Sequence, residues 1–351
     1  MTQLYQKLRQ HAELWDLFTR KEEYSPRKLD EYDCFNHEYS ENRDIEKPVV
    51  SKFLVENGLD CTYPGEKPFA VCLTHDVDEV YPPPSHTILS SLACMKNRQI
   101  SRLPGQLFWK RDGNINSPYR NFAEIMDLEE KYGAQSSFYF LATDADIKRP
   151  RYTIEELQED LGRIVDRGWE VGLHGGYYAY NDLEAIVREK DRIERVVGRK
   201  VTGYRNHYLR FKVPDTWVHL ARAGFEYDTT LGYNDAIGFR NGMCHPFHPV
   251  DRNNNGAVLD ILEIPLAIMD ATLISSMKTY DEAMSASKRL VDVVESLNGV
   301  ITLNWHSNNF NCPFRDLWEK FYEDLLRYCS DKNGWLTNGE HIRGWFDSQR
   351  G

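Results

Sequence analysis

The sequence predicts an α/β fold built as a closed or nearly closed (β/α) barrel. Short apolar runs typical of buried strands alternate along the chain with longer amphipathic stretches typical of helices. The apolar runs number seven, and polar or ionisable residues follow the ends of nearly all of them. Strands alternating with helices indicate parallel pairing, and in such barrels the functional groups lie at the carboxyl ends of the strands.

The first strand is expected at residues 69–74, where a continuous apolar run indicates burial on both faces. Residues 1–66 before it are charged, rich in Tyr and interrupted by prolines, and we expect a helical and loop extension packed on the barrel. Residues 67–351 are expected to form the barrel domain. A stretch of mixed character at about 80–120 is too long for a simple connection, which predicts an insertion over the site.

The regular alternation of elements resumes at residue 121 and continues to residue 329. The expected elements are helix 121–132, strand 136–141, helix 154–167, strand 170–174, helix 182–197, strand 201–205, helix 216–223, strand 225–228, strand 262–269, helix 280–297, strand 300–305 and helix 314–329. A second insertion is expected at about 233–260, between strand 225–228 and strand 262–269.

Composition and charge exclude several classes of function and location. A formal net charge of -11 argues against nucleic acid as a partner, because phosphate binding needs clustered Lys and Arg. The N-terminal residues lack the apolar core of a signal peptide, and no stretch reaches the roughly 18 apolar residues that span a bilayer. The seven cysteines are scattered without a Cys-x-x-Cys pair, which argues against disulfides or a cysteine zinc site. We therefore expect a cytoplasmic protein without a transmembrane segment; its oligomeric state is not predicted.

Two carboxylates follow the first strand in the motif Thr74-His-Asp-Val-Asp78. Asp76 and Asp78 are two residues apart just past a strand, so both can point toward one cavity. One could hold a divalent cation while the other takes a proton from the attacking water. Taken alone, an Asp-x-Asp pair is equally consistent with a turn or a helix start.

Histidines follow two further strands. His174 precedes two glycines, which let a ligand approach the backbone, although such a residue is more often structural than metal-binding. His306 ends the last strand and could protonate a leaving amine near neutral pH. The alternative for His306 is a core histidine stacked on Trp305. Other strand ends carry Arg205, Asp228 and Asp270.

Five segments occur in the order of the motifs of a known family. They are Thr74-His-Asp-Val-Asp78, His174, Gly203-Tyr-Arg205 with His207-Tyr208, Gly224-Phe-Glu-Tyr-Asp228 and Leu303-Asn-Trp-His306. In this order the chain resembles the polysaccharide deacetylase superfamily (carbohydrate esterase family 4) over about residues 69–345. It is most similar to the bacterial branch whose first motif reads His-Asp-Val-Asp, associated with surface-polysaccharide biosynthesis. The resemblance implies a deformed (β/α)7 barrel with one divalent metal, zinc first, with cobalt, nickel or manganese as alternatives.

The resemblance also implies roles for residues of the first three motifs. Asp76 would be the general base that deprotonates the attacking water. Arg205 would fix Asp76 in its ionised form through a charge-assisted pair. Asp78 and His174 would hold the metal.

The remaining roles concern the acid and the developing negative charge. His306 would protonate the departing amine, with a carboxylate behind it, for which Asp270 is the first choice and Asp228 the second. The metal and a backbone N–H near Tyr208 would stabilise the oxyanion.

The sequence departs from the family pattern at the metal site. Tyr178 stands where the second motif usually has another histidine, and a neutral phenol is a poor ligand for zinc. The missing ligand could be His207, His75, Asp182, or solvent and substrate. His207 also replaces the usual proline of the third motif. Tyr178 could instead donate a hydrogen bond to the substrate.

Further substrate contacts are expected from Tyr208, Trp305 and Arg240. Arg240 lies in the second insertion and could bind a substrate carboxylate or phosphate, or it could be a structural arginine.

Three functional hypotheses follow. The leading one is removal of an N-acyl group, such as acetyl, from an amino sugar or its nucleotide-linked or lipid-linked form, with a small molecule or oligosaccharide as the partner. The second is hydrolysis of another linear or cyclic amide, such as a formamide or an allantoin-like ring, with or without a metal. The third is a degenerate barrel that binds carbohydrate without turning it over.

Overall fold

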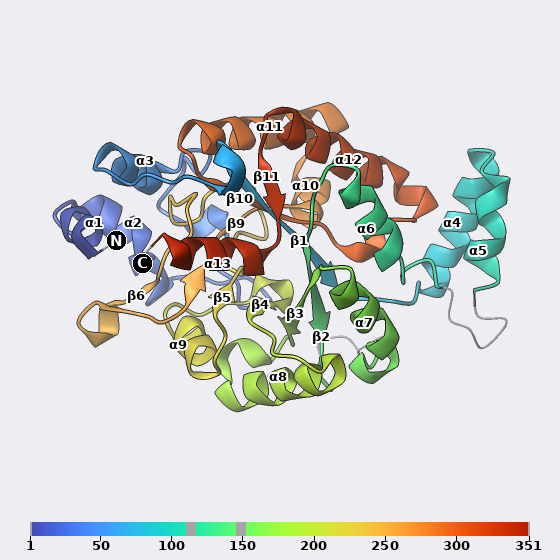
Figure 1. Ribbon diagram of the computed structural model, residues 1–351, viewed down its shortest axis with the longest axis horizontal. Coiled ribbons are helices and arrows are strands. Elements are labelled where there is room, and N and C mark those ends of the chain that lie inside the picture. Colours follow the sequence, from blue (N-terminus) through green and yellow to red (C-terminus); the bar gives the residue numbers. More distant parts are fainter. Residues whose placement is uncertain (1, 110–116, 145–151, 350–351) are drawn as a thin grey trace.

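A curled parallel sheet forms the centre of the molecule (Figure 1). The computed structural model describes residues 2–109, 117–144 and 152–349, so residues 110–116 of the first predicted insertion lie outside it. The strands of the sheet are β1 (Ala70–Val77), β2 (Ser137–Leu141), β3 (Glu170–Gly175), β4 (Gly203–Asn206), β5 (Tyr227–Asp228), β8 (Leu262–Glu263), β9 (Leu266–Met269), β10 (Val300–Asn304) and β11 (Trp335–Thr337). Their order is β8-β5-β4-β3-β2-β1-β10-β9, with β11 beside β1 and every neighbouring pair parallel. The predicted α/β barrel class is confirmed.

The two ends of this sheet, β8 and β9, are consecutive in the chain. The sequence pattern predicted one continuous strand at 262–269, and this detail was wrong, because Pro265 has no backbone N–H to donate to a ladder. On either side of it, Ile264 N donates to the Asp228 carbonyl at 2.9 Å and Leu266 N donates to the Leu231 carbonyl at 3.1 Å. The sheet therefore closes through a single interrupted strand, which gives the barrel its deformed shape.

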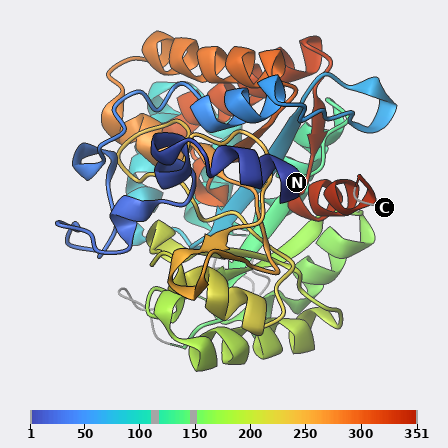
Figure 2. The same cartoon turned by 90° about the vertical axis from the view of Figure 1, so that its left-hand side faces the viewer.

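Helices surround the sheet and cover its outer face (Figures 1 and 2). They are α6 (Phe122–Glu130), α7 (Gln158–Asp166), α8 (Leu183–Val197), α9 (Asp215–Arg222), α10 (Asp270–Ser276), α11 (Tyr280–Ser296), α12 (Asp316–Asp331) and α13 (Gly339–Ser348). Each of the longer helices turns an apolar stripe inward; in α8 it includes the buried Ile186 and Ile193, two turns apart. The side chain of Asp182 caps α8 by accepting from Ala185 N at 3.1 Å.

Tyrosines fill the middle of the barrel interior. Tyr139 and Tyr227 are fully buried there, and their hydroxyls lie 3.2 Å apart. They pack over glycines of the neighbouring strands: a Cβ at Gly172 would lie 2.4 Å from the Tyr139 ring, and one at Gly203 would lie 2.2 Å from the Tyr227 hydroxyl. Because the middle of the barrel is packed solid, only the carboxyl ends of the strands are left for chemistry.

The N-terminal residues lie against the barrel in three helices, α1 (Thr2–Leu8), α2 (Ala12–Phe18) and α3 (Val49–Glu56) (Figure 2). A buried ion-pair network joins them to the second insertion. Glu23 accepts hydrogen bonds from Arg20 Nε at 2.5 Å and from Arg240 Nε at 3.0 Å. Arg240 is 2% exposed and also donates to the Gly232 carbonyl. The expectation that Arg240 binds substrate was therefore wrong, since its guanidinium is already paired inside the protein.

Replacing Glu23 with Gln should lower the free energy of unfolding by about 3–5 kcal/mol, because two buried guanidinium groups would lose their shared carboxylate. Urea denaturation of the full chain measures this change. The exposed carboxylate of Glu13 in α2 provides the matched control, and Glu13→Gln should change stability by less than about 0.5 kcal/mol. Equal losses in the two variants would contradict the anchoring role of the network.

The two predicted insertions contain secondary structure of their own. Residues after β1 form the helices α4 (Pro84–Lys96) and α5 (Leu103–Leu107), and the second insertion contains the antiparallel pair β6 (Val250–Asp251) and β7 (Ala257–Val258). Among the helices of residues 2–109, 117–144 and 152–349, none has the length and apolar character needed to cross a membrane.

Candidate active site

Asp76 lies near the carboxyl end of β1 and is almost completely buried. Its Oδ2 accepts a hydrogen bond from Asn304 Nδ2 at 2.7 Å, and Arg205 Nε lies 3.7 Å from Oδ1. Arg205 is held in turn by the hydroxyls of Thr74 and Thr229, at 3.0 Å and 3.2 Å. Within the described residues, Oδ1 of Asp76 has no hydrogen-bond partner. The surroundings thus fix one carboxylate oxygen and leave the other available as a proton acceptor.

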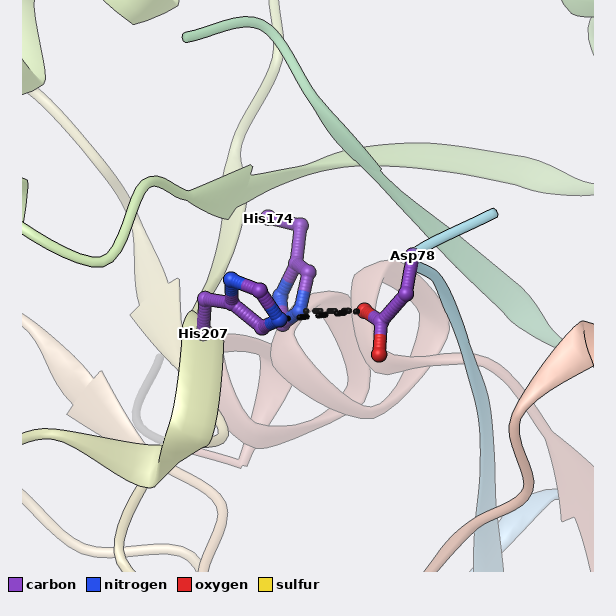
Figure 3. Close-up of side chains that lie close together, drawn as sticks. All are labelled: Asp78, His174 and His207. Carbon is purple, nitrogen blue, oxygen red and sulfur yellow. Dashed lines mark ion pairs between the residues drawn. The ribbon is translucent and has the colours of Figure 1, made fainter. Parts of the chain in front are cut away.

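Asp78, His174 and His207 bring together three side chains of the kinds that can hold a metal ion (Figure 3). His174 Nε2 lies 3.2 Å and His207 Nε2 lies 3.6 Å from Asp78 Oδ1. The residues come from three places: the end of β1, the end of β3 and a short turn after β4. Burial opposes the charge of Asp78, but His207, His174 and His306 hold the pKa of its carboxyl well below the usual range.

The donor atoms of this cluster fit a divalent cation. His174 Nδ1 lies 3.0 Å from the Arg205 carbonyl, which can only accept, so neutral His174 carries its proton on Nδ1 and turns the Nε2 lone pair toward Asp78. Neither His174 Nε2 nor Asp78 Oδ1 has a hydrogen-bond partner among the described residues. Ligands of tetrahedral zinc at about 2.0–2.1 Å from the metal are about 3.3 Å from one another. The separations of 3.2 and 3.6 Å match this spacing.

His306 is paired with a buried carboxylate. Asp270 Oδ1 lies 2.6 Å from His306 Nδ1, and Asp270 Oδ2 accepts from the backbone N–H of His306 at 2.8 Å and from Asn309 Nδ2 at 2.5 Å. Burial opposes a charge on His306, but Asp270 and then Asp78 and Asp76 raise its pKa to about 10. His306 Nε2 lies 3.7 Å from Asp78 Oδ2, so the ring presents its second nitrogen to the metal-binding cluster.

His75, a candidate metal ligand, and Trp305, a candidate substrate contact, both face the outside of the barrel, away from the site. Side chains alternate along a strand, so His75 points away from the side of Asp76. His75 Nε2 lies 2.9 Å from Glu129 Oε1, and His75 Nδ1 lies 2.7 Å from the carbonyl of Trp305. The Trp305 side chain is fully buried and stacks on Phe321 of α12 at 5.5 Å. His75 as a metal ligand and Trp305 as a substrate contact were therefore wrong.

Asp228 does not reach His306 either. Because β5 directs Tyr227 into the interior, the next residue faces the opposite way, where Asp228 accepts from Thr230 Oγ1 at 2.5 Å. Burial raises the pKa of its carboxyl. The second choice for the partner of His306 was wrong, and Asp270 occupies that place.

The position of Tyr178 explains how the metal-binding set differs from the family pattern. The side chain of Tyr178 is 58% exposed and its ring packs beside Tyr177 at 5.0 Å, while His207 stands with Asp78 and His174. Asp182, the other carboxylate considered for the missing ligand, caps α8. Among the alternatives left open by the sequence, the structure brings His207 to the cluster.

Aromatic rings continue outward from the metal-binding cluster. Tyr208, which has a left-handed backbone with φ of 61°, packs its ring 4.6 Å from that of His207. The Tyr208 ring also lies 5.0 Å from Tyr32 of the N-terminal extension and 5.5 Å from Tyr177. This row of rings suits the apolar face of a sugar.

The extension holds the loop that carries His207 and Tyr208. Cys34 Sγ lies 3.3 Å from the carbonyl of Tyr208. Arg210 donates from Nε to the Tyr32 carbonyl at 2.8 Å and from Nη2 to Asp33 Oδ2 at 2.6 Å. The first segment of the chain is thus bonded to Tyr208 and Arg210, which lie on the same loop as His207.

The sequence analysis did not identify two amide side chains that hydrogen-bond to carboxylates of the site. Asn304 bonds Asp76, and Asn309 bonds Asp270. The sequence does contain a signal for Asn304. It lies two residues before His306, and because side chains alternate along a strand, both residues face the same side. Asn309 lies in a short turn after the strand, for which the sequence carries no comparable pattern.

The chain resembles known proteins over part of its sequence and in its fold. No family model matches the chain. A stretch of 133 residues is 26% identical to the peptidoglycan deacetylase of Helicobacter pylori (strain ATCC 700392 / 26695) and covers 33% of this chain and 45% of that protein. The match therefore spans less than half the length of the curated relative.

Solved structures share the fold over most of the chain. A Mycobacterium smegmatis protein, described only provisionally as a polysaccharide deacetylase, has a TM-score of 0.55 at 17% identity and covers 83% of this chain and 94% of its own. The PuuE allantoinase has a TM-score of 0.54 at 15% identity over 92% of this chain and 97% of its own. At these identities the likeness shows the fold.

Proposed function

We propose that this chain belongs to the polysaccharide deacetylase superfamily and is a metal-dependent hydrolase that removes an N-acyl group, such as acetyl, from an amino sugar. One observation carries the proposal. A buried carboxylate with a free oxygen, a three-residue metal-binding cluster and a histidine–carboxylate pair converge at the carboxyl ends of the strands. A barrel that only binds carbohydrate has no use for such a set.

The metal would be held by Asp78, His174 and His207. When bound, a divalent cation supplies Lewis acidity, which polarises the acyl carbonyl and lowers the pKa of water. Two imidazole nitrogens and one carboxylate oxygen suit zinc, with cobalt, nickel and manganese as alternatives that accept the same donors.

Asp76 acts as the general base in this proposal. Its free Oδ1 takes a proton from the water that attacks the acyl carbon, while Asn304 holds Oδ2 and the guanidinium of Arg205 lies beside the carboxylate. The carbonyl electrons move onto the oxygen as the new C–O bond forms, and the resulting tetrahedral carbon carries the sugar nitrogen as its leaving group.

His306 completes the reaction as the general acid. Its Nε2 proton passes to the sugar nitrogen as the C–N bond breaks, which releases a free amine and a carboxylic acid. Asp270 holds the ring by Nδ1 at 2.6 Å and directs Nε2 toward the cluster. Asp270 is therefore a positioning residue rather than a group that touches the substrate.

The substrate is proposed to be a sugar of surface-polysaccharide biosynthesis, linked to a nucleotide or a lipid. Tyr208 and the exposed Tyr178 offer ring faces and hydroxyls beside the site for a sugar to stack on and bond. All seven cysteines are free thiols, which supports a reducing compartment such as the cytoplasm.

Acetate release tests the proposal. The full chain loaded with zinc is incubated with UDP-N-acetylglucosamine and with N-acetylglucosamine oligomers, and acetate and free amine are measured together. We expect equal amounts of both products from at least one sugar. Ring opening of allantoin without acetate release from any N-acetylated sugar would overturn the proposal in favour of a cyclic-amide hydrolase.

The pH profile tests the pairing of His306 with Asp270. Since Asp270 raises the pKa of His306, the acid stays protonated through neutral pH, and activity is lost only as the pH rises through that raised pKa. Asp270→Asn removes the charge, lowers the pKa and should move the alkaline limb of kcat/KM to lower pH. Asp182→Asn, which changes only the cap of α8, should leave the limb in place. If the alkaline limb of kcat/KM stayed at the same pH in Asp270→Asn, the result would contradict the pairing of His306 with Asp270.

A further inference from the structure

In the helices that follow β1, small or polar side chains are buried and large apolar side chains are exposed, which is the reverse of the usual arrangement. In α4 the small or polar side chains of Ser90, Ser91 and Cys94 are buried, while the large apolar ones are exposed. The exposed set consists of Ile88, Leu89, Leu92 and Met95, at 46% to 60% exposure. Their spacing places them on one face of the helix. A helix that served only the protein core would show the opposite arrangement.

The same reversal continues beyond α4. Ile100 is 58% exposed, and in α5 Gln106 is buried while Leu107 is 46% exposed. Together Ile88, Leu89, Leu92, Met95, Ile100 and Leu107 form what we call the insertion face. Exposed apolar side chains gathered on one segment in this way mark surfaces that contact a partner or a membrane.

The charge of this segment is also unlike the rest of the chain. The protein has 54 acidic residues, yet residues 80–111 contain no Asp or Glu and five Lys or Arg. Arg102 pairs with Asp316, whereas no ion pair is found for Lys96 or Arg98 within the described residues. Because the chain as a whole is acidic, the exposed Lys96 and Arg98 give this segment a local positive charge that suits an anionic partner.

The segment that carries the insertion face begins close to the proposed active site along the chain. Six residues separate the end of β1 at Val77 from the start of α4 at Pro84, and one of them is the metal-binding Asp78. In Figure 1 α4 and α5 stand at the far right, at the opposite end of the molecule from α1 and α2. The helices therefore project from the body of the protein on a short connection to the site.

We propose that α4 and α5 dock this protein on the surface of an anionic lipid membrane, with the insertion face against the acyl-chain boundary and Lys96 and Arg98 at the phosphates. Apolar side chains combined with flanking cations are what interfacial helices use to bind such surfaces. A second copy fits less well, since a symmetric dimer would bring each basic segment against its own counterpart. The docking does not depend on the proposed activity; given that activity, it favours a lipid-linked over a nucleotide-linked substrate.

Cosedimentation with vesicles tests the docking. The full chain is mixed with vesicles of phosphatidylglycerol and phosphatidylcholine in equal parts, and with vesicles of phosphatidylcholine alone. We expect binding to the anionic vesicles that weakens with salt and is at least about tenfold weaker on the neutral ones. Absence of binding to the anionic vesicles would overturn the proposal.

Two variants separate the insertion face from the rest of the surface. Ile88→Glu combined with Leu92→Glu should reduce vesicle binding at least about tenfold, while Val258→Glu, at a 56% exposed apolar residue of β7, should bind like the wild type. Light scattering measures the mass of each protein without vesicles. A wild-type dimer that the double variant converts to monomer, or equal vesicle binding by both variants, would overturn the proposal. Acetate release from a soluble sugar is recorded alongside, so that failure of docking and failure of the proposed activity are told apart.

Discussion

Replacing Asp76 with Asn should slow acetate release by about 10²–10⁴-fold, the range expected when a positioned proton acceptor is lost. The amide keeps the shape of the carboxylate, and its oxygen can still accept from Asn304, so the barrel should fold as before. It cannot, however, take a proton from water. The measurement is kcat for acetate release by the zinc-loaded protein.

Metal content distinguishes a chemical effect of this change from a structural one. Asp78, His174 and His207 form the cluster without Asp76, so zinc bound per chain should equal that of the wild type in Asp76→Asn. Asp182→Asn alters a carboxylate that only caps α8 and should keep full activity. A variant at Asp76 that retains both its zinc and its rate would show that another group is the base.

Replacing His174 with Ala should remove stoichiometric zinc and, with it, acetate release. The change deletes a ligand whose tautomer is fixed by the Arg205 carbonyl. Loss of a group that merely orients a ligand costs about 10–100-fold in metal affinity, so loss of the ligand itself should cost more. Elemental analysis after dialysis, together with a zinc titration, measures the loss.

Tyr178 provides the control for the metal site. The family pattern would place a ligand at this position, whereas the structure places an exposed phenol there. Tyr178→Ala should therefore retain zinc, while His207→Ala should lose it. The reverse result would contradict the Asp78, His174 and His207 set, and full activity of the metal-free wild type would contradict a metal-dependent mechanism.

The fold was predictable because local pattern and global architecture agree. Apolar runs alternating with amphipathic helices give the parallel strands, and polar residues at the strand ends mark the edge where chemistry takes place. The expected positions of Asp76, Asp78 and His306 needed only this rule and the motif order. The period of two along a strand would also have separated His75 and Trp305, which face the helices, from their inward-facing neighbours.

Other features depend on contacts that no local pattern encodes. Arg240 looks like a free cation in the sequence, and only the fold brings Glu23 to it across 217 residues. The choice between His207 and Tyr178 likewise depends on the turn after β4, where two consecutive residues, Tyr208 and Leu209, have left-handed backbones. The reversed polarity of α4 is visible only once its buried side is known, because its apolar residues alone predict an ordinary core helix.

Cys34 and Asp33 of the N-terminal extension bond to Tyr208 and Arg210, which lie on the loop that carries His207. Cys34 is 174 residues from Tyr208 and Asp33 is 177 residues from Arg210, yet both contacts fall within three residues of His207. We expect the extension to influence the position of the His207 imidazole relative to Asp78, because it holds the loop that carries His207. Changes in the length or composition of the extension could alter which metal the protein prefers, and how tightly, with every ligand left untouched.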